Sequence, residues 1–134
     1  MLCIYCGGET QVTNSRLQKK ANWVWRRREC SKCSGVFTTL EQADLATSLL
    51  YKTKTGHFEP FSRDKLFLSI YNSLKHRKTS PSDATSLTAT VMVNLSGHIK
   101  DATIQRDDII RVTIEVLKRF DRSASTAYDA YHPA

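Results

Sequence analysis

Cys3-Ile4-Tyr5-Cys6-Gly7-Gly8 opens the chain, and Cys30-Ser31-Lys32-Cys33-Ser34-Gly35 repeats the pattern further on. These two Cys-x-x-Cys pairs hold all 4 cysteines of the 134-residue sequence. A tight turn in each pair would aim two sulfur atoms at one ion, and glycine permits the positive φ that such turns need. A closed set of four thiolates suits tetrahedral Zn²⁺ and leaves no coordination position for a substrate. The sequence therefore predicts one structural zinc ion, bound by Cys3, Cys6, Cys30 and Cys33.

Three other uses of the cysteines compete with zinc. A disulfide framework is disfavoured in the reducing cytosol, where we expect this chain because no secretory signal is visible in its sequence. A thioredoxin-like redox site would need one motif beside a βαβ unit, and the pattern indicates no such unit. A rubredoxin-type iron centre uses the same two turns, and spacing alone does not separate it from zinc. The doubled motif favours zinc.

Composition indicates a folded protein, with 40% hydrophobic and 25% charged residues. No apolar run approaches the roughly 20 residues of a membrane span, so we expect no membrane partner and a cytoplasmic location. The formal net charge is +7. It is spread over the whole chain, and four thiolates with one Zn²⁺ would offset part of it in the N-terminal region. The overall charge is therefore a weak indicator of a nucleic-acid partner, and the clustering of arginines matters more.

The pattern predicts an α+β fold in two domains, residues 1–46 and 47–134. The first has few large aliphatic residues, and so small a domain usually needs a metal or disulfides. Its strand-like stretches, residues 9–16, 23–29 and 35–40, predict a ribbon of short antiparallel strands.

The second domain should combine a small sheet with a helical bundle. Thr55-Gly56 predicts the turn of a hairpin, Ser62 the N-cap of one helix and Ser80 the N-cap of the next, which Gly97 ends. The expected strands are residues 48–52, 57–59 and 103–104, and further apolar helical faces fall in residues 66–74, 87–95, 109–120 and 123–131.

Arg26-Arg27-Arg28 precedes the second cysteine pair, and Arg16 lies nearby in sequence. Because side chains alternate along a strand, Arg26 and Arg28 would share one face and Arg27 the other. Arginine makes bidentate contacts with phosphate and with guanine edges. A solvated basic edge is the simpler alternative, but three consecutive arginines on a small domain favour nucleic acid. Trp23 and Trp25 are better suited to hairpin packing than to base stacking.

The sequence resembles the bacterial repressors of ribonucleotide reductase genes, the NrdR family. The resemblance covers nearly the whole chain in order. It is carried by the opening Cys-x-x-Cys-Gly, Asn14-Ser15-Arg16-Leu17, Val24-Trp25-Arg26-Arg27-Arg28-Glu29-Cys30, Phe37-Thr38-Thr39-Leu40-Glu41 and Glu59-Pro60-Phe61-Ser62-Arg63-Asp64-Lys65-Leu66, and more loosely by the C-terminal segment. The family usually has Asp at the position of Asn14 and a fourth arginine at that of Trp25, so the set of DNA contacts differs here.

The resemblance implies that the second domain is ATP-cone-like, a helical bundle capped by a small β-sheet, which binds ATP or dATP and sets the oligomeric form. It implies that Arg16, Arg26, Arg27 and Arg28 contact a double-stranded DNA operator. It also implies nucleotide-binding roles for Lys52 or Lys54, Glu59, Lys65, Tyr128 and Tyr131. The residues themselves show no P-loop motif, although Lys52, Lys54 and Lys65 fall on the predicted hairpin and the following helix, where they could converge on one polyphosphate.

The sequence therefore leads to a nucleotide-responsive, homo-oligomeric transcriptional repressor with one structural zinc ion. The alternative is a zinc-ribbon module that binds RNA or protein without nucleotide regulation, and a third hypothesis is a small iron-containing redox protein. We expect no enzyme, because the four histidines are scattered and no nucleophile has a base beside it in the pattern.

Overall fold

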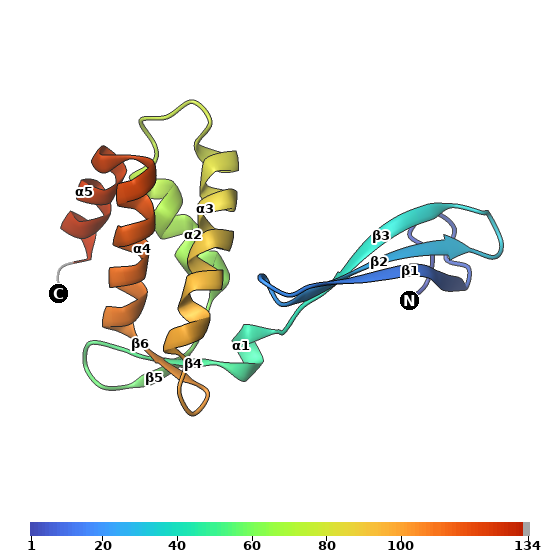
Figure 1. The fold of residues 1–134 in the computed structure, drawn as a ribbon, viewed down its shortest axis with the longest axis horizontal. Coiled ribbons are helices and arrows are strands. Elements are labelled where there is room, and N and C mark those ends of the chain that lie inside the picture. The colour runs from blue at the N-terminus through green and yellow to red at the C-terminus, as the bar shows by residue number, and fades with distance from the viewer. Residues whose placement is uncertain (133–134) are drawn as a thin grey trace. The chain divides into compact units, whose positions relative to one another are not determined.

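The computed structural model describes residues 1–132, which form two compact units: Met1–Ala43, and the described residues from Asp44 onward. Figure 1 shows strands alone in the first unit and helices with a small sheet in the second. The predicted α+β class is confirmed. The division falls just before α1 (Leu45–Ser48), a short helix that the sequence analysis missed and that Asp44 caps by accepting a hydrogen bond from Ala46 N at 3.1 Å.

The first unit is a three-stranded antiparallel sheet in the order β1-β2-β3, with β1 at Thr10–Gln18, β2 at Trp23–Cys30 and β3 at Val36–Glu41. All three predicted strands are present. The β1–β2 register shifts between Val12 and Asn14, where Thr13 is an extra residue that forms a β-bulge. The buried cluster of this unit contains only Cys3, Cys30 and Phe37. So small a core stabilises a sheet of this size weakly, which agrees with a need for metal.

The second unit is a helical bundle with a three-stranded sheet at one end. The sheet order is β5-β4-β6, in which β4 (Leu50–Lys52) pairs antiparallel with β5 (Phe58–Pro60) and parallel with β6 (Thr103–Gln105). The longer helices are α2 (Arg63–Ser73), α3 (Ser80–Leu95), α4 (Arg106–Phe120) and α5 (Arg122–Tyr131). Figure 1 shows α2, α3 and α4 side by side. Their apolar faces meet in one core, in which Ile70, Leu74, Val91 and Leu117 are fully buried.

Two helix boundaries test the sequence reasoning closely. Ser62 caps α2 as predicted, because its Oγ accepts a hydrogen bond from Lys65 N at 3.2 Å. The prediction that Ser80 caps α3 is wrong. Ser80 is the first residue of that helix and is buried, while Thr79 stands at the cap position and its hydroxyl binds Asp83 instead. Proline is tolerated in the first turn of a helix generally, so Pro81 did not fix the start to one residue.

The end of α3 also differs slightly from the prediction. The helix stops at Leu95, and the predicted stop at Gly97 lies within a 3-10 turn, Ser96–His98. Within the described residues, no helix has the length and apolar character needed to cross a membrane. Only Gln42 and Ala43 stand between the end of β3 and the residue that caps α1.

Candidate functional site

Four sulfur atoms converge at one end of the ribbon sheet. The Sγ atoms of Cys3, Cys6, Cys30 and Cys33 all lie within 4.8 Å of one another. Cys3 Sγ is 3.7 Å from Cys33 Sγ, and Cys6 Sγ is 3.5 Å from Cys30 Sγ, so each short contact joins the two turns. Sulfurs bound to a tetrahedral zinc ion at about 2.3 Å would lie about 3.8 Å apart. The donor set and its spacing therefore fit one Zn²⁺, and all four thiols are free of disulfides.

The local backbone explains how each turn presents its sulfurs. Backbone amides point at them: Tyr5 N lies 3.4 Å from Cys3 Sγ, and Gly35 N lies 3.4 Å from Cys33 Sγ. The Cys33 amide donates to Cys30 Sγ at 3.4 Å and is the main reason that the pKa of the Cys30 thiol is lowered to about 6. Such donors favour the thiolate, which is the form that binds metal.

Glycine serves the two turns differently. Gly7 has φ +75°, the left-handed conformation expected from the sequence. In the second turn Ser34 has the positive φ of 59°. Gly35 is needed there because neighbouring atoms leave no room for a Cβ. A Cβ at Gly35 would lie 2.6 Å from Cδ2 of Tyr5 and 3.1 Å from Cys33 Sγ. The ring of Tyr5 in turn packs edge-on against Phe37, so the second turn, the first turn and the small core are interlocked.

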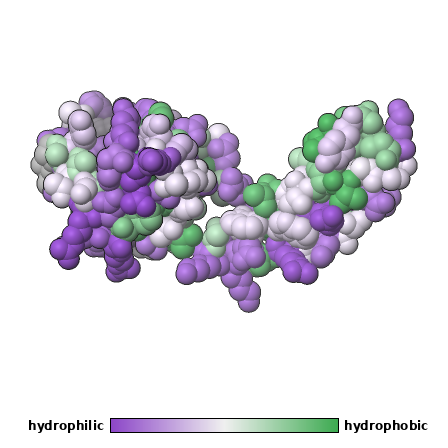
Figure 2. Space-filling model, turned by 90° about the horizontal axis from the view of Figure 1, so that it is seen from above, coloured by the Kyte–Doolittle hydropathy of each residue, from purple (hydrophilic) through white to green (hydrophobic). Residues whose placement is uncertain are grey.

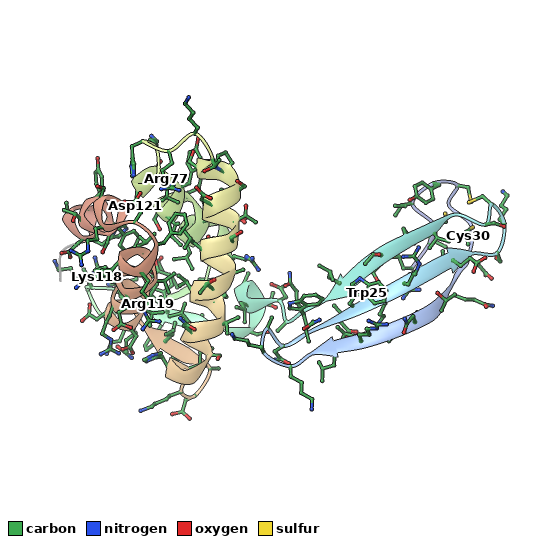
Figure 3. All side chains as sticks on the ribbon, turned by 45° about the horizontal axis from the view of Figure 1, so that its top comes forward. Trp25, Cys30, Arg77, Lys118, Arg119 and Asp121 are labelled. Atoms are coloured by element: carbon green, nitrogen blue, oxygen red, sulfur yellow. The ribbon has the colours of Figure 1, made fainter. Side chains whose placement is uncertain are left out.

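Apolar side chains surround the outside of the metal centre. Leu2, Ile4 and Tyr5 are more than half exposed. Figure 2 shows hydrophobic residues gathered on this end of the ribbon unit. Figure 3 shows Cys30 at this end of β2 and Trp25 farther along the same strand.

The predicted DNA-binding arginines lie on neighbouring strands but not on one face. Arg27 and Arg16 are exposed, whereas Arg26 and Arg28 are only partly exposed. Arg26 donates to Ser15 Oγ at 2.9 Å and pairs with Glu41 Oε2 at 2.8 Å. The predicted alternation of Arg26, Arg27 and Arg28 follows from the regular β2 strand. Trp23 and Trp25 are two residues apart on this strand, so they share one face, and both are partly buried.

A cavity of about 410 Å³ lies in the helical unit, at the end that carries the small sheet. Its polar lining comes from the hairpin loop between β4 and β5 and from the start of α2: Thr53, Lys54, Thr55, Ser62 and Lys65. Its apolar lining comes from Phe61, Leu66, Ile109, Ile110 and Tyr128. This combination of an apolar wall with a few convergent cations is typical of a small-molecule site.

The structure separates the predicted nucleotide residues into three groups. Lys54, Lys65 and Tyr128 line this cavity. Tyr131 lines an adjoining cavity, also of about 410 Å³, which shares Ser69 and His132 with the first. Lys52 and Glu59 line neither cavity. The alternation of side chains along β4 explains why Lys52 lies outside the first cavity. Tyr51 lines that cavity, so the side chain of Lys52, the next residue, is on the other face of the sheet.

Glu59 is exposed and does not line the cavity, but it contacts a residue that does. Its Oε2 accepts a hydrogen bond from the Tyr51 hydroxyl at 2.7 Å, and that bond is the main reason that the pKa of Tyr51 is raised. Glu59 therefore orients a lining residue. Its place opposite Tyr51 in the β4–β5 pairing puts both side chains on one face of the sheet.

Among the polar lining residues that sequence reasoning missed are Arg106 and His132. Arg106 begins α4 and contributes a third cation, and its side chain is 24% exposed. His132 stacks on the ring of Tyr128, with the ring centroids 4.1 Å apart. Tyr128 is itself fully buried, which raises the pKa of its hydroxyl. Arg106 carried no signal because it lies far in sequence from the hairpin. His132 could have been found from its spacing of one helical turn after Tyr128.

Comparison with known proteins agrees with these features. Residues 1–41 match the family model described as "Transcriptional repressor NrdR-like, N-terminal domain". The chain is 36% identical over 129 residues to the transcriptional repressor NrdR of Chelativorans sp. (strain BNC1), covering 96% of this chain and 82% of that protein.

Two further relatives carry the same name. The protein of Bartonella henselae is 34% identical over 122 residues, covering 90% of this chain and 75% of its own length. The protein of Streptococcus pneumoniae (strain Hungary19A-6) is also 34% identical over 122 residues, covering 90% and 76%. This is a family of transcriptional repressors and not of enzymes, which confirms the expected absence of catalysis. The chain belongs to the NrdR family of transcriptional repressors.

Proposed function

We propose that this repressor binds double-stranded DNA through its zinc-held ribbon and is controlled by ATP or dATP bound in the cavity of its helical unit. The observation that carries the nucleotide part is the convergence of Lys54, Lys65 and Arg106 on one cavity with an apolar wall. Three cations suit a polyphosphate, and the wall suits a purine base.

The start of α2 adds to the attraction for phosphate. Ser62 and Lys65, which line the cavity, are the cap and the first turn of an 11-residue helix. The N-terminal end of a helix carries partial positive charge from its aligned peptide dipoles. Lys54 projects from the hairpin loop across the same cavity, so the phosphates would be held between the loop and the helix. Lys54, rather than Lys52, is then the phosphate-binding lysine of the hairpin.

Control would act through assembly. A ribbon of 43 residues makes few contacts with a duplex, and two ribbons held together bind more tightly without any new kind of contact. A nucleotide shifts the balance between homo-oligomers only if it binds them with different affinities. The oligomer that best spaces its ribbons for one operator is then the repressing form.

Lys65→Ala tests the cavity directly. We expect this variant to lose most of its affinity for ATP and dATP in titration calorimetry while its helical content stays unchanged, because Lys65 is exposed. Lys118→Ala is the matched control, since Lys118 is an exposed lysine on α4 that does not line the cavity. Equal affinity of the wild type and Lys65→Ala would remove the lysine from the site.

Solution size decides between this function and its rival. Light scattering of the wild-type protein without nucleotide, with ATP and with dATP should give different masses. A zinc-ribbon module without nucleotide regulation would show one mass in all three conditions and no nucleotide affinity. Metal analysis and the visible spectrum test the third hypothesis, since a colourless protein with one zinc ion per chain has no iron centre.

A further inference from the structure

The three arginines of β2 are divided between the two faces of the ribbon sheet. Arg27 pairs with Asn14 of β1 and with Thr38 of β3, so these three side chains form one row. The next row on the same face holds Arg16, Trp25 and Leu40. The residues of these two rows are called the Arg27 face below: Asn14, Arg16, Trp25, Arg27, Thr38 and Leu40. Five of these six residues are exposed, and Trp25 is partly buried.

The opposite face holds its two arginines within the protein. Arg26 is bound by Ser15 on one side and Glu41 on the other, and its side chain is 33% exposed. Arg28 Nη1 donates to Thr10 Oγ1 at 3.3 Å. Its Nε is buried and has no partner among the described residues, so that donor faces protein rather than solvent. Both guanidinium groups therefore hold neighbouring strands of the ribbon together.

The β-bulge at Thr13 creates the Arg27 face. Before the bulge Val12 pairs with Arg28, and after it Asn14 pairs with Arg27. Without the extra residue, Thr13 would stand opposite Arg27, and Asn14 would move to the other face with every residue after it. The Thr13 hydroxyl donates to the Arg27 carbonyl at 3.3 Å, which holds the extra residue in place. The bulge thus brings Arg16 and Asn14 beside Arg27.

The side chains of the Arg27 face have the chemistry of a surface that reads a duplex. Neither Arg16 nor Arg27 forms an ion pair with a described residue, so both charges are available to phosphate. Asn14 can donate to and accept from an adenine edge, and strands of this kind fit the major groove. Glu29 is on the same face toward the metal centre, and its charge would keep phosphates away from that end.

We propose that the ribbon contacts DNA through the Arg27 face alone, with Arg16 and Arg27 on phosphates and Asn14 at a base edge, while Arg26 and Arg28 maintain the fold of the ribbon. This inference rests on the proposed DNA binding and specifies where it occurs. It narrows the contact set implied by family resemblance from four arginines to two.

Salt titration of DNA binding tests whether Arg16 and Arg27 contact DNA while Arg26 and Arg28 maintain the fold. The probe is a fluorescein-labelled pool of random-sequence duplexes, bound by the full-length zinc-loaded protein and followed by anisotropy. Each phosphate contact contributes about 0.9 to the slope of log affinity against log salt. We expect Arg27→Ala and Arg16→Ala each to reduce that slope by about 0.9 per bound ribbon. Arg26→Ala and Arg28→Ala should leave the slope unchanged and lose zinc to a chelator faster than the wild type.

Two outcomes overturn the division. One is an undiminished slope in the Arg16→Ala and Arg27→Ala variants, which should fold because both side chains are exposed. The other is a slope reduced by Arg26→Ala or Arg28→Ala with unchanged zinc retention. A wild-type protein that shows no salt-dependent binding would instead contradict DNA binding itself.

Asn14→Asp gives an independent measure of the base contact. An aspartate at this position keeps the size of the side chain but removes its donors, so it can no longer make the paired contact with adenine. We expect selection from the random pool to enrich adenine at one position with the wild type and to lose that preference with the variant. Identical selected sequences would remove Asn14 from the base contact.

Discussion

The two units of this repressor reach stability by different physical means. The ribbon unit buries three residues in its core and places two of its four metal-binding cysteines among them. The helical unit buries a continuous cluster that joins the small sheet to all four longer helices. Apolar burial of that kind stabilises a domain without a ligand. The ribbon unit therefore depends on an ion for its fold, whereas the helical unit should fold through the burial of its own side chains.

The largest expected effect comes from breaking the metal centre. Cys30→Ser, or chelation of zinc, should unfold the ribbon unit, because binding energies of about 10 kcal/mol make the metal part of the fold. The helical unit should keep its structure. Far-UV circular dichroism would show loss of strand signal with retained helix, and DNA binding would disappear. A ribbon that stays folded without metal would contradict the zinc assignment.

A core substitution in the helical unit should have a smaller effect, and it should destabilise the helical unit rather than the ribbon unit. Ile70 is fully buried on α2, so Ile70→Ala should lower the free energy of unfolding of that unit by about 2–5 kcal/mol. Ile70→Val is the matched control and should cost about 1 kcal/mol. Denaturant titration measures both. Zinc content and the chelator sensitivity of the ribbon should not change, and a change in either would mean that the units are coupled.

The smallest of the three effects concerns Asp121, which caps α5. Its carboxylate accepts hydrogen bonds from Ser123 N at 2.8 Å and Ala124 N at 3.2 Å, and it contacts His76 and Arg77. Figure 3 shows Asp121 near Arg77 at the α4–α5 junction. Asp121→Ala should therefore lower the free energy of unfolding by about 1 kcal/mol, as expected for a lost N-cap.

The same residue gives a pH dependence with a definite sign. The hydrogen bond with His76 is the main reason that the pKa of Asp121 is lowered from 3.8 to about 2. A carboxyl group whose pKa is lower in the folded state stabilises the fold above its ordinary pKa. That contribution is lost as the pH falls from about 4 to 2. Denaturant titrations across this range should show a steeper loss for the wild type than for Asp121→Ala, and parallel curves would contradict the assignment.

Sequence reasoning was most successful where spacing alone defines the structure. The two Cys-x-x-Cys pairs specify the metal-binding turns, and the hairpin, the Ser62 cap and the apolar faces of the helices follow local patterns. The family resemblance to NrdR was also confirmed. The short α1 was missed because four residues give no periodicity to detect.

The remaining features depend on contacts between segments that are distant in sequence. The Thr13 bulge, which decides the face on which Arg16 stands, leaves no signature in composition. Lys52 and Lys54 are equivalent in the sequence, and only the alternation of β4 and the path of the loop distinguish them. Arg106 reaches the cavity because β6 pairs with β4, a parallel pairing that the sequence analysis did not predict.

The short joint between the units has a mechanical consequence. Gln42 and Ala43 together span at most about 7 Å even when fully extended. If the ribbon binds DNA as proposed, so short a tether would limit how far it could reach from the helical unit. Inserting glycines would lengthen the joint and loosen the connection between the two units. The ribbon should then keep its affinity for a single DNA site, while changes in the assembly of the helical units should affect DNA binding less.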